Sequence, residues 1–238
     1  MKTGKAPTPP FRFKRFTVCQ DRCAMKVGTD GVALGAWAEG GKRILDIGTG
    51  TGLIALMMAQ RFPEATIVGI DIDEMACQQA TENAQQSDFG RRISIVHAAL
   101  QHVPFDAQFD AIVSNPPFFE HSLKNPDARR MVARHAESLP LRDLFACAAR
   151  LLTDNGMLSL IIPDDRMEAI ISESSLSGFF LIKDYALKTV PRKPVKRHLL
   201  AFSKHSVPQI DEQQVCVLNA DGSRSDWYRQ LTQAFFID

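Results

Sequence analysis

The clearest chemical signal in the sequence comes from four consecutive residues after an apolar segment: Asn115, Pro116, Pro117 and Phe118. The side-chain oxygen of Asn115 and the carbonyl oxygen of Pro116 are two acceptors that can bind both N–H groups of one amino nitrogen. The two prolines restrict the backbone, so these acceptors are in place before a substrate arrives. Phe118 offers a face for base stacking, worth about 1–3 kcal/mol per base. The four residues predict a site that orients a planar amino group for reaction with an activated donor.

A second group of residues predicts a nucleotide-type cofactor. An apolar segment containing Asp46 runs into a glycine turn, and a second apolar segment ends at Asp71. The glycines of the turn are Gly48, Gly50 and Gly52. A strand, a glycine turn, a helix and an acid-tipped strand form one half of a nucleotide-binding α/β sheet. Glycines let the backbone turn sharply and approach a ligand closely, and the carboxylate of Asp71 can accept from both hydroxyls of a ribose.

The strand, glycine turn, helix and acid-tipped strand are compatible with two cofactors. NAD is favoured by the stretch from Gly50 to Ala55, which matches G-x-G-x-x-A. S-adenosylmethionine (SAM) is favoured by Asp46, because a carboxylate just before the glycines would repel a pyrophosphate but suit the ammonium of an amino-acid moiety. A glycine turn without any ligand is the structural alternative. The pattern D-x-G-x-G-x-G over 46–52 resembles motif I of the class I SAM-dependent methyltransferases.

Residues 115–118 resemble the (N/D)-P-P-(Y/F/W) motif of methyltransferases that modify planar amide or exocyclic amino nitrogens. The resemblance implies catalytic roles for these four residues and SAM as the cofactor. The implied cofactor-binding residues are Lys26, Thr29, Asp46, Gly48, Gly50, Gly52, Asp71, Ile72, Ala98, Ala99 and Asn115. Ala98 and Ala99 stand where the family usually has an acid for the SAM adenine, so that contact is assigned to their backbone. The stretch Gly28–Gly31 resembles motif X, which helps hold the methionine end of SAM; a plain helix cap at Thr29 is the alternative.

The remaining sequence indicates how these residues are positioned. Apolar strand-like segments alternate with amphipathic helix-like segments from 44 to 162, which predicts a mainly parallel sheet with helices on both faces. Strands over 179–190 and 197–203, joined by a basic turn over 191–196, resemble the antiparallel pair that ends class I methyltransferase sheets. The prediction is an α/β class I SAM methyltransferase (Rossmann-like) fold with seven strands and an antiparallel last strand. A small edge strand over 215–218 and a helix over 226–236 follow.

The N-terminal region is predicted as an extension of the same domain. Residues 1–10 read as a mobile tail, and 11–38 as a hairpin followed by a helix. The hairpin is expected to return over 24–27, and 154–156 is expected to be a turn. Without repeats or a second domain, residues 1–238 are predicted to form a single methyltransferase domain, monomeric in solution.

Charge and composition limit the possible partners. The net charge is +1, so nucleic acid would have to bind a local patch. Two basic stretches could track RNA phosphates, with a solvated surface as the alternative: Lys124, Arg129, Arg130 and Arg134 in the first, and Arg192, Lys193, Lys196 and Arg197 in the second. Five cysteines without metal-ligand spacing predict reduced thiols and no metal. The sequence contains neither a long apolar run nor a signal-type N-terminus, so a cytoplasmic protein with no membrane segment is expected.

Three substrate classes share the 115–118 motif: adenine in nucleic acid, guanine N2 in ribosomal RNA, and glutamine in release factors. Release-factor enzymes usually carry Tyr at the fourth position and a helical domain, and DNA enzymes usually carry a target-recognition domain. Over nearly its whole length the chain resembles the bacterial tRNA1(Val) adenine-N6 methyltransferases, which methylate the adenine at position 37, 3′ of the anticodon. The alternatives are a guanine-N2 ribosomal RNA methyltransferase and a non-catalytic RNA-binding module.

Overall fold

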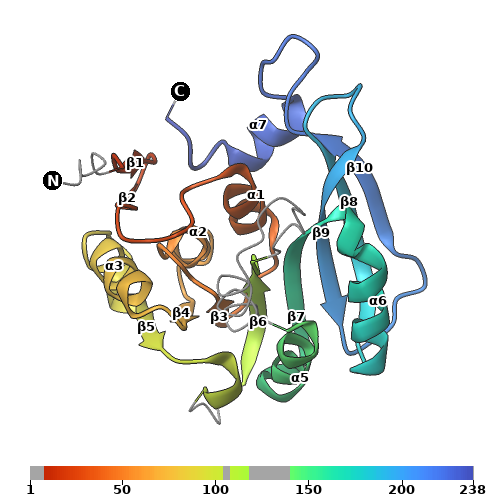
Figure 1. The fold of residues 1–238 in the computed structure, drawn as a ribbon, viewed down its shortest axis with the longest axis horizontal. Helices are drawn as coiled ribbons and strands as arrows, with labels where there is room; N and C mark the ends of the chain where they lie inside the picture. Colours follow the sequence, from red (N-terminus) through yellow and green to blue (C-terminus); the bar gives the residue numbers. More distant parts are fainter. Residues whose placement is uncertain (1–7, 104–107, 118–139, 238) are drawn as a thin grey trace, which may run out of the picture.

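The computed structural model describes residues 8–103, 108–117 and 140–237. Eight strands of the described chain form one sheet in the order β10–β8–β9–β7–β6–β3–β4–β5 (Figure 1). Their bounds are β3 Arg43–Ile47, β4 Thr66–Asp71, β5 Ile93–His97, β6 Phe109–Ser114, β7 Leu152–Pro163, β8 Phe180–Lys188, β9 Val195–Ser203 and β10 Asp211–Cys216. Strands β5, β4, β3, β6 and β7 run parallel, and β9 is antiparallel to both of its neighbours. The predicted fold class is confirmed, with one strand more than the predicted seven.

The additional strand is β10, which begins well before the edge strand expected over 215–218. It pairs in parallel with β8 along its whole length, from Asp211 opposite Lys183 to Cys216 opposite Lys188. The expected turn over 154–156 is wrong, because β7 continues through it. Leu152, the first residue of β7, already pairs with Phe109, and the next pair is Ala111 with Met157, so residues 153–156 form an irregularity in β7.

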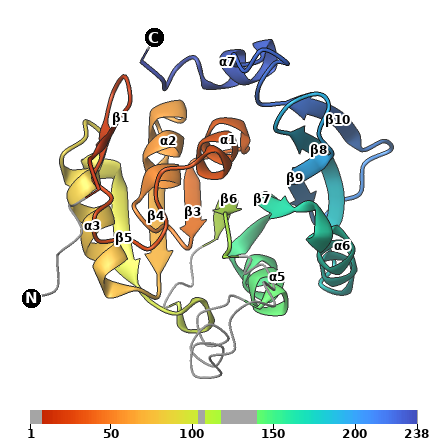
Figure 2. The same cartoon turned by 45° about the horizontal axis from the view of Figure 1, so that its top comes forward.

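Helices cover both faces of the sheet (Figure 2). On one face lie α1 (Thr29–Trp37), α2 (Leu53–Arg61), α3 (Glu74–Gln85) and α7 (Asp226–Thr232), and on the other lie α5 (Leu141–Leu151) and α6 (Met167–Leu176). Short 3-10 turns occur at Gly90–Arg92, Leu100–His102 and Asp164–Arg166. Four of the five residues of β3 are buried, because it is flanked by β4 and β6 and covered on both faces. This double burial explains the continuous apolar character of the central segments.

The N-terminal hairpin is shorter than expected. β1 (Phe11–Arg12) pairs with β2 (Thr17–Val18), and both strands lie before residue 20. The return strand expected over 24–27 is wrong, because the chain forms a compact loop there. The ammonium of Lys26 donates to the carbonyls of Gln20 at 2.5 Å and Cys23 at 2.7 Å, which closes the loop.

The start of α1 also differs from the expectation. Its N-cap is Gly28, which makes no side-chain capping bond, and Thr29 is the first helical residue. Thr29 is therefore not the cap. Its hydroxyl is excluded from this role because a capping side chain must precede the first helical residue.

Candidate functional site

Four parallel strands end side by side and bring the predicted site residues to one edge of the sheet. Ile47 at the end of β3 pairs with Ile70 of β4 and with Ser114 of β6. Asp71 at the end of β4 pairs with His97, the last residue of β5. The segments that follow these strands therefore lie next to one another, in the order Ala98, Ile72, Gly48 and Asn115. With about 4.8 Å between neighbouring strands, the row is roughly 15 Å long.

The glycine turn after β3 has the open geometry expected of a ligand site. Gly48, Gly50 and Gly52 have φ angles of +71°, +55° and +79°. The N–H groups of Gly48 and Thr49 both donate to the carbonyl of Ile70, each at 2.9 Å, so the turn is tied to the end of β4. A Cβ added to Gly48 would meet nothing within 4 Å, and one added to Gly50 would meet only the Gly48 carbonyl at 4.0 Å. A ligand can therefore lie directly against this backbone.

Asp71 is fixed at the rim of this open space. Its Oδ2 accepts from the Gly50 N–H at 2.8 Å and its Oδ1 accepts from the Asp73 N–H at 3.0 Å. Each carboxylate oxygen can accept a further bond, so the half-buried Asp71 can still bind two hydroxyls. Ile72 follows with 57% of its surface exposed, and Met75 is 45% exposed. These exposed apolar side chains beside an acid suit an adenosine, with the sugar on Asp71 and the ring against Ile72.

At the end of β5, two of the backbone groups of Ala98 and Ala99 that were expected to contact the SAM adenine already have hydrogen-bond partners. The Ala98 N–H donates to the Asp71 carbonyl at 3.0 Å, and the Ala99 carbonyl accepts from the His102 N–H at 2.9 Å. These two groups are engaged in fixing the strand end. A backbone contact to an adenine amino group in this region would therefore use the remaining groups of Ala98 and Ala99.

Asp46 lies beneath the glycine turn, with no exposed surface. Its Oδ2 accepts from the Thr49 hydroxyl at 2.7 Å and from the Ala55 N–H at 3.1 Å, while Oδ1 has no partner among the described residues. Burial, with a smaller contribution from the nearby Asp71, raises the pKa of Asp46 to about 7, although the hydrogen bonds from Thr49 and Ala55 act to lower it. The carboxylate therefore shapes the turn and supplies negative charge from below it, without reaching the surface to touch an ammonium. A buried acid that lacks a counter-charge fits a cationic ligand above the turn, such as SAM.

This arrangement gives a pH-dependent prediction for cofactor binding. A cationic ligand prefers ionised Asp46, so SAM affinity should rise as the pH is raised through about 7 and fall below it. Calorimetric titrations with SAM between pH 5.5 and 8.5 measure this. Asp46→Asn is the matched control, because it keeps the side-chain shape without the charge, and its SAM affinity should be nearly independent of pH. A wild-type profile as flat as that of the variant would contradict the role of this carboxylate.

The 115–118 motif begins directly beside the glycine turn. Ser114, the last residue of β6, is buried, and its hydroxyl donates to the Ile47 carbonyl at 2.9 Å. Asn115 and Pro117 are half-buried and Pro116 is buried. The bond from Ser114 fixes the starting point of the motif relative to the turn, so Asn115 lies at the end of the row where the methionine part of SAM would lie. Phe118 falls outside the described residues, as do Lys124, Arg129, Arg130 and Arg134.

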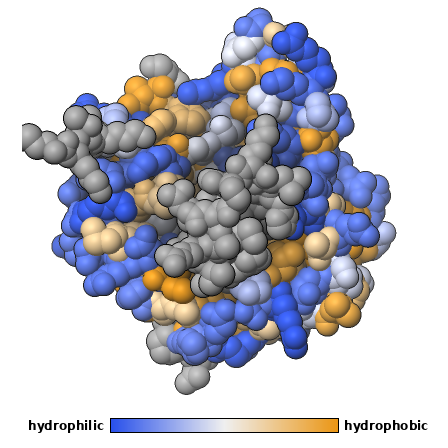
Figure 3. All heavy atoms as spheres, in the orientation of Figure 1, coloured by the Kyte–Doolittle hydropathy of each residue, from blue (hydrophilic) through white to orange (hydrophobic). Residues whose placement is uncertain are grey.

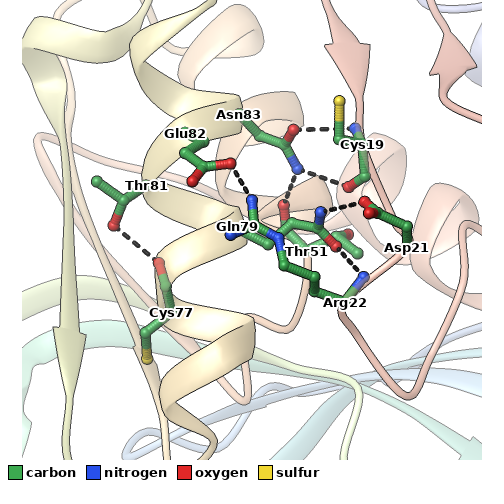
Figure 4. Close-up of polar contacts among 9 residues, drawn as sticks. All are labelled: Cys19, Asp21, Arg22, Thr51, Cys77, Gln79, Thr81, Glu82 and Asn83. Atoms are coloured by element: carbon green, nitrogen blue, oxygen red, sulfur yellow. Dashed lines mark hydrogen bonds and ion pairs between the residues drawn. The ribbon is translucent and has the colours of Figure 1, made fainter.

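Two amides on α3 were missed by the sequence interpretation (Figure 4). The buried Asn83 donates to the carbonyls of Cys19 at 2.9 Å and Thr51 at 2.8 Å, and accepts from the Cys19 N–H at 2.9 Å. Gln79, one turn earlier, donates to Asp21 at 2.7 Å and accepts from the Arg22 N–H at 3.0 Å. Two amides four residues apart on an otherwise apolar helix face are the signal that could have identified them.

These amides attach the N-terminal loop to the glycine turn. Asn83 bonds the loop and the turn with the same side-chain amide, so residues 19 and 51 are both joined to α3. Lys26 closes this loop through its bonds to Gln20 and Cys23, and its role at the cofactor stays a prediction.

The basic turn after β8 lies at the same edge of the sheet as Asn115, since β8 and β6 run in the same direction. Arg192, Lys193 and Lys196 are exposed there. Arg197 is half-buried, and its Nε donates to Asp30 Oδ2 at 2.8 Å, which ties β9 to the first turn of α1. Thr29 and Asp30 line a cavity of about 580 Å³ whose lining includes neither the glycine turn nor Asp71. Thr29 therefore lies beside the basic residues of this cavity, and its contact with the cofactor stays a prediction.

His198, which follows the basic turn, is not part of an exposed cationic surface. It is buried between Asp184 at 2.7 Å and Asp164 at 2.9 Å. The bond to Asp184, followed by the bond to Asp164, raises the pKa of His198. This side chain therefore joins β8, β9 and the segment after β7.

The described residues contain no group of three or more His, Cys, Asp or Glu side chains placed to hold a metal ion. All five cysteines are free thiols. Among the helices of residues 8–103, 108–117 and 140–237, none is long and apolar enough to cross a membrane.

Comparison with known proteins agrees with the geometry. The model of the family "Methyltransferase small domain" matches residues 36–174, more than half of the chain. The tRNA1(Val) (adenine(37)-N6)-methyltransferase of Bacteroides thetaiotaomicron is 42% identical, covering 96% of this chain and 98% of the relative. The enzyme of the same name from Phocaeicola vulgatus is 44% identical, covering 98% and 99%.

A solved structure described as a predicted O-methyltransferase from Agrobacterium tumefaciens shares the fold. Its TM-score is 0.69 at 18% identity, and the match covers 87% of this chain and 96% of the other. At this identity the likeness concerns the fold alone. The two relatives above match nearly end to end at more than 40% identity, and the chain belongs to the family of tRNA1(Val) (adenine(37)-N6)-methyltransferases.

Proposed function

We propose that this protein methylates the N6 amino group of an adenine in tRNA, at position 37 of tRNA1(Val), with SAM as the methyl donor. The observation that supports this most directly is the placement of Asn115 and Pro116 at the end of β6, beside the glycine turn. Relatives that match nearly the whole chain carry the same activity in their names. The proposal includes a single-domain monomer that acts in the cytoplasm, where tRNA is modified.

The chain's own residues position both reactants. Asp71 and Ile72 would hold the adenosine part of SAM, and the open backbone at Gly48 and Gly50 would lie along the methionine part. When bound, SAM supplies an activated methyl group on a sulfonium. The Asn115 side-chain oxygen and the Pro116 carbonyl would accept hydrogen bonds from both N–H groups of the target amino group, which directs its nitrogen lone pair toward that methyl.

Holding the amino group in this way addresses the chemical difficulty of the reaction. The lone pair of an adenine amino group is delocalised into the ring, so the nitrogen is a poor nucleophile. Two acceptors favour a more tetrahedral nitrogen, and this geometry is reached only near the transition state. The donor is activated, so no covalent nucleophile is required.

The function is tested by incubating the protein with tRNA transcripts and isotopically labelled SAM, followed by nucleoside mass spectrometry. N6-methyladenosine in tRNA1(Val), lost when A37 is replaced by G, is the expected result. Labelled N2-methylguanosine would instead support the guanine-N2 alternative. No labelled nucleoside from any RNA would support a non-catalytic RNA-binding module.

The exposed turn between β8 and β9 gives a separate prediction for RNA binding. Arg192→Ala and Lys193→Ala should each weaken tRNA binding and reduce the slope of log affinity against log salt by about one unit, while SAM affinity is unchanged. Lys42→Ala is the matched control, because Lys42 is exposed beside the start of β3, at the opposite edge of the sheet. Slopes for the turn variants equal to that of Lys42→Ala would show that the turn is only a solvated surface.

A further inference from the structure

We propose that the cavity beside α1 is a second RNA subsite, which holds a nucleotide flanking the target adenine. This inference rests on the proposed function, since the flanking nucleotide belongs to the same tRNA. The cavity, here called the flank cavity, is lined by residues of β1, the start of α1, the facing ends of β8 and β9, and the C-terminal region, among them Phe11, Asp30, Lys188, Lys196, Arg224 and Phe236. Its volume of about 580 Å³ lies within the range of small-molecule sites, roughly 300–1,000 Å³.

The charges around the flank cavity favour an anion. Four cationic side chains line it, and Asp30 is the single carboxylate among the lining residues. Asp30 is occupied by Arg197, whereas Lys188 and Lys196 form no ion pair within the described part of the chain. Cations gathered around one hollow repel one another, so the cluster costs stability unless a ligand supplies negative charge. The phosphates of RNA are such a ligand.

The apolar part of the lining favours a nucleotide over a free anion. The rings of Phe11 and Phe236, from β1 and the C-terminal segment, are half-buried in the lining, whereas the Tyr228 ring of α7 is buried. Arg224 lies over the Phe236 ring, with 4.0 Å between the guanidinium carbon and the ring centroid, so a cationic group already lies against an aromatic ring at this site. A nucleobase can stack on the same kind of surface, at about 1–3 kcal/mol per base. Figure 1 locates α7 and the ends of β8 and β9. In the same orientation, Figure 3 shows hydrophobic and hydrophilic residues side by side in this region.

The position of the flank cavity matches a neighbour of the target base. Lys188 ends β8, and Lys196 lies near the start of β9 opposite it, so both face the edge of the sheet at which Asn115 lies. Strands β7 and β9 separate β6 from β8, and three strand spacings of about 4.8 Å give roughly 14 Å between the two sites. RNA recognition commonly splays single-stranded bases out of the loop, and this separation suits nucleotides of one anticodon loop held in two places.

Variants of the flank cavity test the inference through binding rather than turnover. Lys188→Glu and Lys196→Glu should weaken binding of an unmodified anticodon-arm transcript at least tenfold and lower the salt slope, with unchanged SAM affinity. Lys42→Glu introduces the same charge change at the opposite edge and should have a much smaller effect. If both cavity variants bind the transcript as well as Lys42→Glu does, the subsite is ruled out.

A second variant tests whether the flank cavity binds a base. Thr189→Phe adds bulk at the cavity without removing charge, so it should weaken binding while leaving the salt slope unchanged. A set of transcripts, each with a single abasic nucleotide at a different position around A37, identifies which base binds in the cavity. One such substitution should weaken binding to the wild type but not to Thr189→Phe. If each abasic position changes transcript binding equally in the wild type and in Thr189→Phe, the cavity does not bind a base.

The outcome is separable from that of the proposed function. If the wild type methylates A37 and the cavity variants bind RNA normally, the function stands and the subsite is lost. If the wild type methylates no adenine in tRNA, the function is lost and the subsite with it, and selective loss of RNA affinity in the cavity variants would then show only that the cavity binds RNA.

Discussion

Asn115→Ala is expected to reduce turnover at least about a hundredfold while SAM affinity stays near the wild-type value. A hundredfold loss corresponds to about 2.7 kcal/mol of transition-state stabilisation. The reason is that Asn115 lies at the end of β6, where its side-chain oxygen would bind the reacting amino group, and the interaction strengthens as the nitrogen becomes tetrahedral. Single-turnover kinetics with saturating SAM and tRNA measure the chemical step, and calorimetry measures SAM affinity.

Asn115→Asp is the matched control for this prediction. Asp occupies this position in the related motif, and it keeps an acceptor oxygen of similar reach. It should therefore retain far more activity than Asn115→Ala, at a similar melting temperature. Equal loss of activity in the two variants would show that the acceptor is not what matters, and wild-type turnover in Asn115→Ala would place the amino-group contact elsewhere.

The sequence was sufficient for the central sheet and the site at its edge, because both depend on local patterns. Double burial makes β3 a continuous apolar segment, and the positive φ angles of the turn require glycine. Residues that follow parallel strands must meet at one edge, so Asp71 and Asn115 could be placed together before any contact was known.

What the sequence did not show depends on contacts between distant segments. Asn83 contacts Cys19 across 64 residues and Thr51 across 32 residues, and no local pattern reveals such partners. A loop likewise lies where a strand was expected over 24–27. The ammonium of Lys26 closes it by donating to the backbone carbonyls of Gln20 and Cys23. The burial of Asp46 is a packing result as well. The sequence placed this acid just before the glycines, where it would suit an ammonium, but could not show that its side chain would be buried against the turn and α2.

The flank cavity shows the same limit. Its lining comes from five separated parts of the chain, from Phe11 to Phe236, and only folding brings them together. The sequence predicted a basic stretch that runs from Lys188 to Arg197, yet it gave no reason to expect Arg224 beside it, because Arg224 is isolated in the chain.

Asp71→Ala is expected to weaken SAM binding at least about a hundredfold, a loss of about 2.7 kcal/mol. Two effects combine: the carboxylate oxygens would no longer accept from the ribose hydroxyls, and the Gly50 N–H would lose its 2.8 Å acceptor. Hydrogen bonds to charged groups contribute about 1.5–3 kcal/mol each, so even one lost hydroxyl contact accounts for most of the expected change. Isothermal titration calorimetry of the purified protein with SAM is the measurement.

The two effects are separated by changing the ligand as well as the protein. An S-adenosylhomocysteine analogue that lacks one ribose hydroxyl should bind the wild type more weakly than S-adenosylhomocysteine itself, whereas Asp71→Ala should bind both compounds about equally. If instead the variant remains as sensitive to the missing hydroxyl as the wild type, Asp71 acts only by holding the turn through Gly50. In that case the hydroxyls are recognised by another group along the row from Ala98 to Asn115, because the open space at Gly48 and Gly50 lies within that row.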